Sequence, residues 1–469
     1  MSFRTEKDSM GAMQVPEAAY YGASTQRAVE NFPVSGWPLP PRFIAALGLV
    51  KLAACRVNLA LGLLDPKLAQ AIEQACREVA DGKLDREFPI DVFQTGSATS
   101  TNMNANEVIA NRAGEILGGA RGARLVHPND HVNLGQSSND VIPTVLHVSA
   151  VLAFEQDLVP ALAHLKLALD AKAKAWDGIV KTGRTHLMDA TPIRLGQEFS
   201  GYASQVEHAI ERAQAVLPHL RELAIGGTAV GTGLNAHPEF GRRVADELTT
   251  LTGAKFSEAR NHFEAQGAQD GACWASGALN SVAASLMKIA NDIRLLNSGP
   301  RCGLSEVSLP ATQPGSSIMP GKVNPVICES VMQVGAHVMG LHVAVTVGAQ
   351  WGQLELNTML PMMANNLLES ARLLSNVCRL FADRAIKDMV ANEETCVSYV
   401  EISPSMATAL NPLIGYDKAA EIAKRSYKER RPVRELAAEM TDLTPAQITE
   451  ALDPRRQTEP GLTGDSPGG

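Results

Sequence analysis

The chain has 469 residues, a formal net charge of −8, 45% apolar residues and 20% charged residues. This length exceeds one compact core and fits two or three domains of an ordinary soluble globular protein. A nucleic-acid binder would carry a basic face, but the densest basic run, KRSYKERR at 424–431, is interrupted and typical of a solvated helix surface.

Cysteine usage and the first residues bear on location. Seven cysteines are scattered without any CxxC pair. Their odd number argues against a disulfide framework, so we expect reduced thiols in a cytoplasmic protein. The opening MSFRTEKDSMG has neither an apolar signal core nor an Arg/Ser-rich transit pattern. No run of about 20 consecutive apolar residues occurs, so no membrane span is expected.

Residues 1–138 are predicted to form an N-terminal mixed helical domain. Short helix-periodic segments at 43–61, 67–81 and 104–117 alternate with loops rich in Gly, Pro, Asn and Ser. Aromatic residues make up only 4% of the chain while Ala is abundant, which favours closely packed helices over sheets.

Residues 139–392 are predicted to form a central bundle of long helices. The helix-periodic segments lie at about 140–176, 192–223, 268–297, 325–350 and 360–390. In one of them, steps of three and four place eight apolar residues on one face: Leu279, Val282, Ala283, Leu286, Ile289, Ala290, Ile293 and Leu296. Rods of about 30 residues bury such stripes most completely in a bundle shared between subunits, so an oligomer is expected.

Residues 393–469 are predicted to form a small C-terminal helical domain with a disordered tail. The tail begins at about 457, where the sequence becomes rich in Gly, Pro and Ser. The glycines of GGTAVGTG at 226–233 lack a leading strand and a suitably placed acidic residue, so they are weak support for a dinucleotide site.

Four polar stretches interrupt or begin the predicted helices. They share Ser, Thr, Asn and His with few acids, and such neutral donors suit small, oxygen-rich anions, although helix capping is the usual role of such clusters. The stretches are QTGSATSTNMN at 94–104, HPNDH with GQSSND at 127–140, GRTHLMD at 183–189 and GSSIMPGKVNP at 315–325.

The stretch at 315–325 is more than a connector. Asn324 and Pro325 are predicted to start a helix, with Asn as the N-cap and Pro as the first helical residue. Lys322 then lies beside a positive helix end, which favours an anion. Ser316 and Ser317 lie on glycine-rich backbone, so the loop is able to fold over that anion and exclude water.

GSSIMPGKVNP matches the signature loop of the fumarase/aspartase superfamily. The chain resembles the class II fumarate hydratases from RTEKDSMG at 4–11 to GYDKAAE at 415–421. The resemblance implies an all-α, three-domain fold whose long helices form the core of a homotetramer, with each active site shared by three subunits. It also implies the reversible hydration of fumarate to L-malate, a reaction of the tricarboxylic acid cycle, by anti addition and elimination through an aci-carboxylate. No metal and no other cofactor is implied.

The resemblance assigns three catalytic residues. Ser316 is the base, His186 lies on the side of the water or hydroxyl, and Glu329 is the acidic partner of the histidine. A serine is a poor base unless amide N–H groups and charge stabilise its alkoxide. The dianionic aci-carboxylate needs fixed donors, for which Lys322 and Asn324 are suited.

Two sets of binding residues follow from the same resemblance. The substrate-binding set is Ser97, Thr99, Ser137, Ser138, Asn139, Thr185, Ser317, Lys322 and Asn324. The accessory carboxylate site is Arg124, His127, Asn129 and Asp130. The i, i+4 spacing of His127 and His131 also fits a zinc site, but Pro128 and the missing third ligand argue against it.

Some positions depart from the fumarase pattern and leave alternatives open. Fumarases usually have Gly where this chain has Ala98, and the methyl group would crowd the substrate or restrict a positive φ. His131 and GQLELN at 352–357 resemble aspartate ammonia-lyases, whereas His127, Ser138 and His186 resemble fumarases. The alternatives are thus an aspartate ammonia-lyase and, in another class, a catalytically idle helical scaffold. Neither a nucleic acid nor a membrane is expected as a partner.

Overall fold

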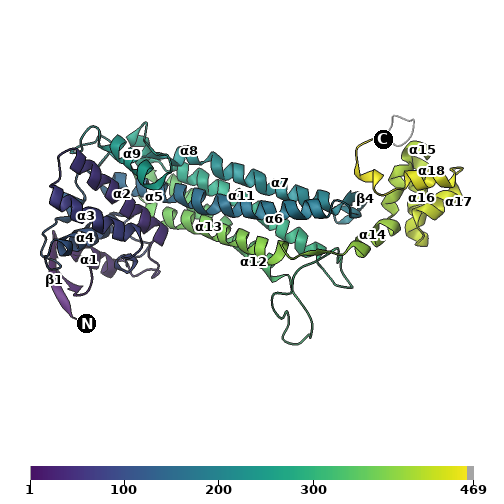
Figure 1. Ribbon diagram of the computed structural model, residues 1–469, viewed down its shortest axis with the longest axis horizontal. Helices are drawn as coiled ribbons and strands as arrows, with labels where there is room; N and C mark the ends of the chain where they lie inside the picture. The colour runs from purple at the N-terminus through teal and green to yellow at the C-terminus, as the bar shows by residue number, and fades with distance from the viewer. Residues whose placement is uncertain (1, 462–469) are drawn as a thin grey trace. The chain divides into compact units, whose positions relative to one another are not determined.

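The computed structural model describes residues 2–461 and is mostly helical (Figure 1). Its backbone contacts divide the chain into two compact units. The first contains Met1–Pro160, Ala209–Ala283 and Val334–Asn376. The second contains Ala161–His208, Ala284–Gln333 and Val377–Gly469. Both units interleave along the sequence, so the predicted domain boundaries at 138/139 and 392/393 stay predictions.

The first unit is organised around α2, which packs against α3, α5 and α9. Its central residues, from Phe43 to Asn58, are almost all buried. The predicted helices at 43–61 and 67–81 are confirmed to within two residues, whereas the one at 104–117 begins five residues earlier. The helices are α1 (Ala23–Asn31), α2 (Pro41–Ala60), α3 (Pro66–Ala80), α4 (Thr99–Ile116), α5 (Ser138–Ala153), α9 (Phe240–Thr252) and α10 (His262–Gly267).

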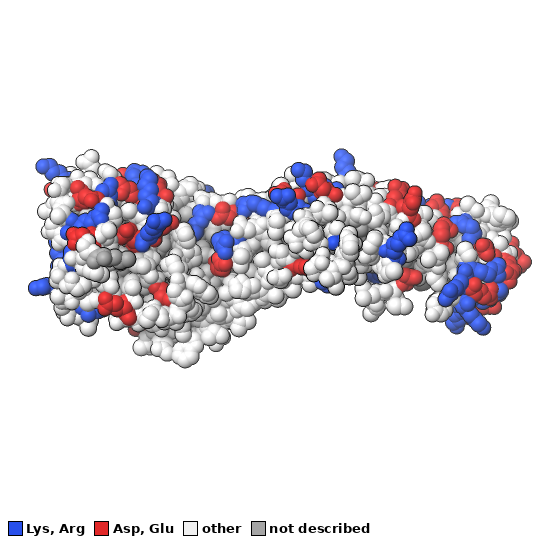
Figure 2. All heavy atoms as spheres, turned by 90° about the horizontal axis from the view of Figure 1, so that it is seen from below, with Lys and Arg blue, Asp and Glu red and all other residues white. Residues whose placement is uncertain are grey.

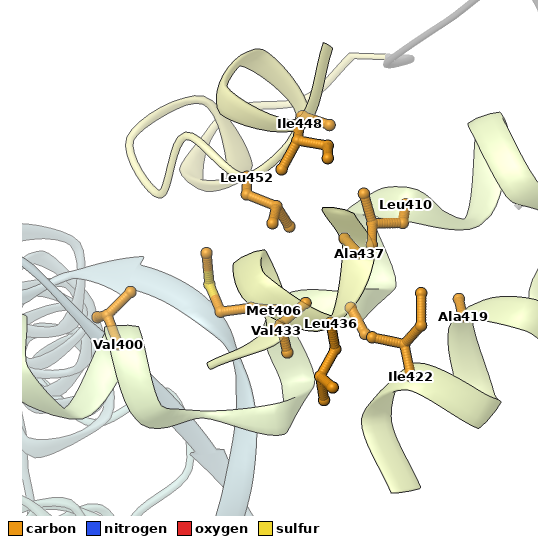
Figure 3. Close-up of a cluster of buried hydrophobic side chains, with 12 residues drawn as sticks. Val400, Met406, Leu410, Ala419, Ile422, Val433, Leu436, Ala437, Ile448 and Leu452 are labelled. Atoms are coloured by element: carbon orange, nitrogen blue, oxygen red, sulfur yellow. The ribbon is translucent and has the colours of Figure 1, made fainter. Parts of the chain in front are cut away.

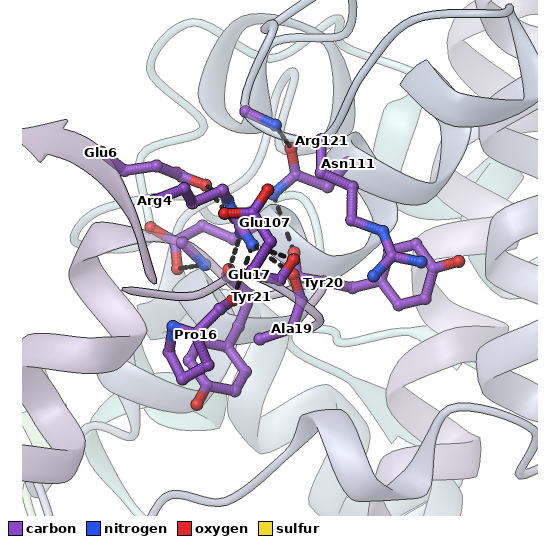
Figure 4. A network of polar contacts seen from close by, with 12 residues as sticks. Arg4, Glu6, Pro16, Glu17, Ala19, Tyr20, Tyr21, Glu107, Asn111 and Arg121 are labelled. Atoms are coloured by element: carbon purple, nitrogen blue, oxygen red, sulfur yellow. Dashed lines mark hydrogen bonds and ion pairs between the residues drawn. The ribbon is translucent and has the colours of Figure 1, made fainter. Parts of the chain in front are cut away.

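An N-terminal hairpin, β1 (Phe3–Asp8) and β2 (Gly11–Pro16), was not predicted. Figure 4 shows how it is held. Arg4 donates to several backbone carbonyls between residues 16 and 21. Glu107 of α4 accepts N–H groups from the first turn of α1 at 2.9–3.0 Å. These bonds satisfy donors that a helix start leaves free.

The predicted long helices are confirmed, with π-helical turns at two ends. All eight apolar residues that define the face at 279–296 are buried. The helices are α6 (Val159–Ala175), α7 (Leu195–Ala215), α8 (Leu217–Leu220), α11 (Asp270–Leu296), α12 (Val326–Gln350) and α13 (Leu360–Phe381), and the π turns are Phe154–Leu158 and Ala382–Ile386. At 27 residues, α11 is about 40 Å long.

The remaining strands form short pairs. The hairpin of β3 (Val180–Thr185) with β4 (Met188–Arg194) is the longest of them and carries predicted site residues. The others are β5 (Glu222–Leu223) with β6 (Ser257–Glu258), β7 (Val307–Ser308) with β10 (Val390–Ala391), and β8 (Gly352–Gln353) with β9 (Leu356–Asn357).

Three helical segments are long and apolar enough to cross a membrane by length and composition. In Pro41–Ala60 and Ser138–Ala175, 72% and 67% of the most apolar window is buried in the protein, but in α12 only 28% is buried. A helix of this chain can therefore be long and apolar enough to cross a membrane without containing an uninterrupted apolar run. Ala336, Gly340, Val343 and Val347 are all exposed on α12, and their spacing of three to four places them on one face.

The C-terminal helices enclose a hydrophobic cluster of their own (Figure 3). Its larger members are Val400, Met406, Leu410, Ile422, Val433, Leu436, Ile448 and Leu452. The helices are α14 (Glu393–Ile402), α15 (Asn411–Ile414), α16 (Tyr416–Glu429), α17 (Val433–Met440) and α18 (Pro445–Ala451), with a 3-10 helix at Pro404–Leu410.

Charged side chains gather over these C-terminal helices (Figure 2). Arg425 lies 2.6 Å from Glu429 and 2.9 Å from Glu439, and Arg431 lies 2.8 Å from Glu439. The basic run at 424–431 is thus a solvated helix surface whose charges are locally paired, as predicted.

The expected disorder from residue 457 is wrong for the first residues of that segment. Arg456–Thr458 form a 3-10 helix. Arg194 donates to the Thr458 hydroxyl at 2.8 Å, and Gln197 donates to the Thr458 carbonyl at 2.9 Å. These side-chain bonds order a segment whose composition alone suggested a tail. Residues 462–469 lie outside the described residues.

Candidate active site

The predicted site residues fall into two groups, one in each compact unit. In the first unit, Thr99, Ser137 and Ser138 line a pocket of about 380 Å³. In the second unit, Lys322, Asn324 and Glu329 line a pocket of about 840 Å³, whereas Ser316 lines, with Lys322, a separate pocket of about 490 Å³. Each group is described by itself below.

In the first unit, three hydroxyls form a chain. Thr99 Oγ1 lies 2.8 Å from Ser97 Oγ and 2.8 Å from Ser138 Oγ. Thr99 is the first residue of α4 and Ser138 the first residue of α5. Since helix N-termini carry partial positive charge and free N–H groups, the hydroxyls stand where a carboxylate is favoured.

The neighbouring residues of this group build the start of α5. Ser137 forms a capping box with Asp140: its side chain accepts the Asn139 N–H at 3.2 Å, and Asp140 accepts the Ser137 N–H at 2.9 Å. Asn139 donates to the carbonyl of Ala229 at 2.8 Å. The side chains of Ser137 and Asn139 therefore both bind backbone groups, and of the three residues of this turn Ser137 and Ser138 line the pocket.

A buried charge lies behind the turn. Asp140 is fully buried and accepts the N–H groups of Ser137, Gly226 and Thr228. Burial raises the pKa of Asp140 to about 6 even though these bonds favour the carboxylate. Asn102, Asn133, Gln136 and Thr228 line the same pocket and were not assigned as site residues. The signal was present for Asn102 and Gln136, which lie within the predicted polar stretches QTGSATSTNMN and GQSSND.

Ala98 has the positive φ that a glycine would adopt without strain. Its φ is 53° and its ψ 28°, it precedes α4, and it is fully buried. The predicted conflict between the methyl group and a positive φ is confirmed. At Gly96, two residues earlier, a side chain does not fit, because a Cβ there would lie 1.9 Å from the Thr358 carbonyl oxygen.

Two substitutions in this loop are expected to change the free energy of unfolding by different amounts. Ala98→Gly relieves roughly 1–2 kcal/mol of backbone strain. It also loses a buried methyl group worth about 0.8 kcal/mol and raises the entropy of the unfolded chain, and both of these destabilise the fold. The free energy of unfolding should therefore change by less than about 1 kcal/mol. Gly96→Ala should lower it by about 2 kcal/mol or more because backbone must move. Urea unfolding of both variants checks this, and equal losses in the two would contradict it.

In the second unit, Thr185 and His186 lie at the tip of the β3–β4 hairpin. Thr185 pairs with Met188, so His186 and Leu187 form a two-residue turn. Their φ values are 56° and 61°. Two positive φ values define a type I′ turn, which normally requires Asn or Gly. Two larger residues in it indicate a turn that the surrounding structure holds in place.

A buried ion cluster anchors this hairpin. Arg184 Nη1 lies 2.9 Å from Glu306 Oε1, and Lys181 Nζ lies 3.1 Å from Glu306 Oε2 and 3.1 Å from Glu198 Oε2. Lys181 is 1% exposed and Glu306 is 0% exposed. Two cations face two anions, so the buried charge is balanced, and the residue before Thr185 is fixed.

The neck of the signature loop is closed by two hydrogen bonds. Gly315 N–H donates to the Lys322 carbonyl at 2.8 Å, and the Asn324 side chain donates to the Gly315 carbonyl at 2.6 Å. The helix that follows, α12, begins at Val326. The prediction that Asn324 caps this helix is therefore wrong: α12 begins one residue later than predicted, and the side-chain nitrogen of Asn324 binds within the loop.

Within the loop, Ser316 is placed as an acceptor. Its Oγ accepts the N–H groups of Ile318 at 3.2 Å and Met319 at 2.9 Å. Both donors favour negative charge on this oxygen. Ser317 follows on the exposed part of the loop.

The larger pocket brings several predicted residues of the second unit together. Lys322, Asn324 and Glu329 line it, as does Leu187, the neighbour of His186. Among the described residues, no hydrogen bond or ion pair joins Glu329 to His186, so their predicted partnership stays a prediction. Arg294, which also lines this pocket, was not predicted; its position near the end of a predicted helix gave no signal.

Of the predicted accessory residues, Asn129 and Asp130 lie in a π-helical turn, Pro128–Val132, which His127 caps. His127 Nδ1 lies 3.2 Å from Asp130 Oδ2, and Asn129 is exposed between them. Arg124, with a φ of 55°, donates to the Lys7 carbonyl. Among residues 2–461, no group of three or more His, Cys, Asp or Glu side chains is arranged to hold a metal ion.

Comparisons with known proteins agree with this fold. A family model described as a lyase matches residues 11–340, and one described as the fumarase C C-terminus matches residues 406–459. The "Fumarate hydratase class II" of Halobacterium salinarum is 56% identical over 464 residues, 99% of each chain. That of Xylella fastidiosa is 52% identical over 98% of this chain and 96% of its own length.

A solved structure is similar over nearly the whole chain. The class II fumarase from Schistosoma mansoni superimposes with a TM-score of 0.95 at 42% identity, over 97% of this chain and 99% of that one. Sequence and fold together define a helical lyase. The chain belongs to the class II fumarate hydratase family. The predicted family and the predicted fumarase/aspartase-like fold are thereby confirmed.

Proposed function

We propose that this chain is a hydro-lyase that interconverts fumarate and L-malate, with Ser316 as the base. Relatives of the same family at 52–56% identity support the reaction. The observation that supports the base is that Ser316 Oγ already accepts two backbone N–H groups. An alkoxide needs such donors, because a serine hydroxyl at its ordinary pKa removes few protons.

The reaction starts with the C–H bond of malate beside a carboxylate. Ser316 takes that proton, and the electron pair moves onto the carboxylate to give the aci-carboxylate. Lys322 and Asn324 stabilise this second negative charge, and a single such donor is typically worth roughly 2.7–4 kcal/mol. The electron pair then returns to form the double bond, and the hydroxyl on the neighbouring carbon takes up a proton on the side of His186 and leaves from the opposite face as water.

The other site residues bind or organise. His186 and its acidic partner Glu329 act on the side of the leaving water. The hydroxyls of Ser97, Thr99 and Ser138, together with Ser137, Asn139, Thr185 and Ser317, form the substrate-binding set. Helix N-termini at Thr99 and Ser138 support this assignment for a dianionic substrate. Arg124, His127, Asn129 and Asp130 form the accessory carboxylate site.

The proposed assembly is a cytoplasmic homotetramer in which three subunits contribute to each active site. The apolar, exposed face of α12 supports it, because a soluble chain covers so long an apolar stripe with other helices. The proposed place in metabolism is the tricarboxylic acid cycle.

The decisive assay supplies the pure protein with L-malate and, separately, with L-aspartate. Fumarate absorbance should rise with L-malate and stay flat with L-aspartate. A rise with L-aspartate alone would identify an ammonia-lyase instead. A flat signal with both, from a protein shown to be folded by circular dichroism, would favour the idle scaffold.

A further inference from the structure

One buried cation in the first unit has no part in the mechanism described above. Lys51 lies in the middle of α2 between Val50 and Leu52, and it is 0% exposed. Burying an ammonium group is costly unless hydrogen bonds and charge compensate it. Burial lowers the pKa of Lys51 to about 7, and the nearby carboxylate of Asp140 acts in the opposite direction.

The hydrogen bonds of Lys51 lead to the pocket. Its Nζ donates to Asn133 Oδ1 at 2.8 Å and to Gln136 Oε1 at 3.0 Å. Asn133 Oδ1 also accepts from the side chain of Asn102 at 3.2 Å. Asn102, Asn133 and Gln136 all line the pocket of about 380 Å³.

These partners belong to two different segments. Asn102 lies one turn beyond Thr99 on α4, and Gln136 directly precedes the Ser137–Ser138 turn that starts α5. A single ammonium group therefore fixes both segments, at whose starts Thr99 Oγ1 and Ser138 Oγ lie 2.8 Å apart.

Two polar atoms of the pocket lining lack a partner. Among the described residues, Asn102 Oδ1 and Thr228 Oγ1 are buried without a hydrogen-bond partner. An unpaired buried polar group costs about 1–3 kcal/mol. The Thr228 hydroxyl is able to donate to a bound carboxylate, whereas Asn102 Oδ1 can only accept and offers a carboxylate no hydrogen bond.

We propose that Lys51 is a positioning residue that, through Asn133 and Gln136, sets the spacing of the Thr99 and Ser138 hydroxyls at the dicarboxylate site. This inference rests on the proposed function. Lys51 does not touch substrate. Its loss should weaken binding of the dicarboxylate and have a smaller effect on chemistry, because the base, Ser316, lies on a different segment.

The test compares Lys51→Met, which keeps the length of the side chain, with Asn133→Ala. Each should raise KM for fumarate about 10-fold or more and lower kcat less than about 3-fold. The double variant should raise KM no further than the stronger single one, since both act through one network. Because Asn133→Ala leaves Lys51 in place, it keeps the proposal testable if Lys51→Met fails to fold.

A matched control is Glu107→Gln. Glu107 is also a buried charge of the first unit, but it is bonded to the start of α1. The Glu107→Gln substitution should lower the midpoint of urea unfolding and leave KM for fumarate unchanged. If Lys51→Met and Glu107→Gln changed stability alike and neither changed KM, Lys51 would be a structural residue and the proposal would be overturned.

Calorimetric titration with succinate separates this inference from the proposed function. The wild-type protein should bind succinate about 10-fold more tightly than Lys51→Met. Wild-type protein that turned over malate, together with a Lys51→Met variant of unchanged succinate affinity, would leave the function in place and overturn the role of Lys51. Wild-type protein that bound succinate but turned over no malate would overturn the function alone.

Discussion

Ser316→Ala is expected to lower the turnover of fumarate and L-malate by about 1,000-fold or more while KM changes little. The variant loses the oxygen that accepts the N–H groups of Ile318 and Met319, and with it the site at which a negative charge is stabilised. A water molecule in its place would be a weaker and less well positioned base.

The loop itself should survive this change. Its neck is closed by the bonds of Gly315 with Lys322 and Asn324, and neither bond involves Ser316. Initial rates at saturating substrate give the loss in kcat, and light scattering checks that the oligomer is unchanged.

Ser317→Ala is the matched control for the base. Ser317 lies next to Ser316 on the same loop, but it is exposed and assigned to substrate binding. Its loss should raise KM and leave most of kcat. Equal losses of kcat in the two variants would show that the loop, rather than one oxygen, was damaged, and unchanged turnover in Ser316→Ala would remove it as the base.

Helix positions could be predicted because they depend on periodicity. The stripe at 279–296 follows steps of three and four, and its residues are all buried. The hairpin at the N-terminus was missed because its first strand is mainly polar and because it depends on Arg4, whose partners lie up to 17 residues away. Local propensity does not contain such contacts.

Site residues could be predicted where they belong to a sequence motif, but not where their role depends on being buried in the folded chain. The loop at 315–325 was found by its composition, but the predicted cap at Asn324 was wrong because α12 starts one residue later, at Val326, than the Asn-Pro pattern indicated. Lys51 carried a signal that was overlooked: it is the lone charge on an otherwise apolar stretch of α2. A charge on a buried face is a candidate for function since it is rarely kept without a partner.

Glu306→Gln is expected to lower the free energy of unfolding by about 3–5 kcal/mol. Glu306 is fully buried and receives both Lys181 and Arg184, so its neutralisation leaves two buried cations facing one anion, Glu198. An amide also donates where the carboxylate accepted, and it therefore opposes one of its neighbours.

Activity should fall together with stability because the same cluster fixes the hairpin. Arg184 precedes Thr185, and the turn at His186 and Leu187 holds positive φ values that need support from its strands. We expect kcat to fall at temperatures at which the variant is still fully folded.

Restoring the charge balance separates electrostatics from packing. In the double variant Glu306→Gln with Lys181→Met, one cation, Arg184, and one anion, Glu198, remain, so the net charge of the cluster is balanced as in the wild-type protein. It should recover part of the lost stability, whereas Glu198→Gln, whose carboxylate is 21% exposed, should cost less than Glu306→Gln because water compensates the change. Urea unfolding of the four proteins measures these differences. If Glu306→Gln were as stable as the wild-type protein, the buried cluster would not be what holds the hairpin, and the position of His186 would have to depend on contacts from outside this unit.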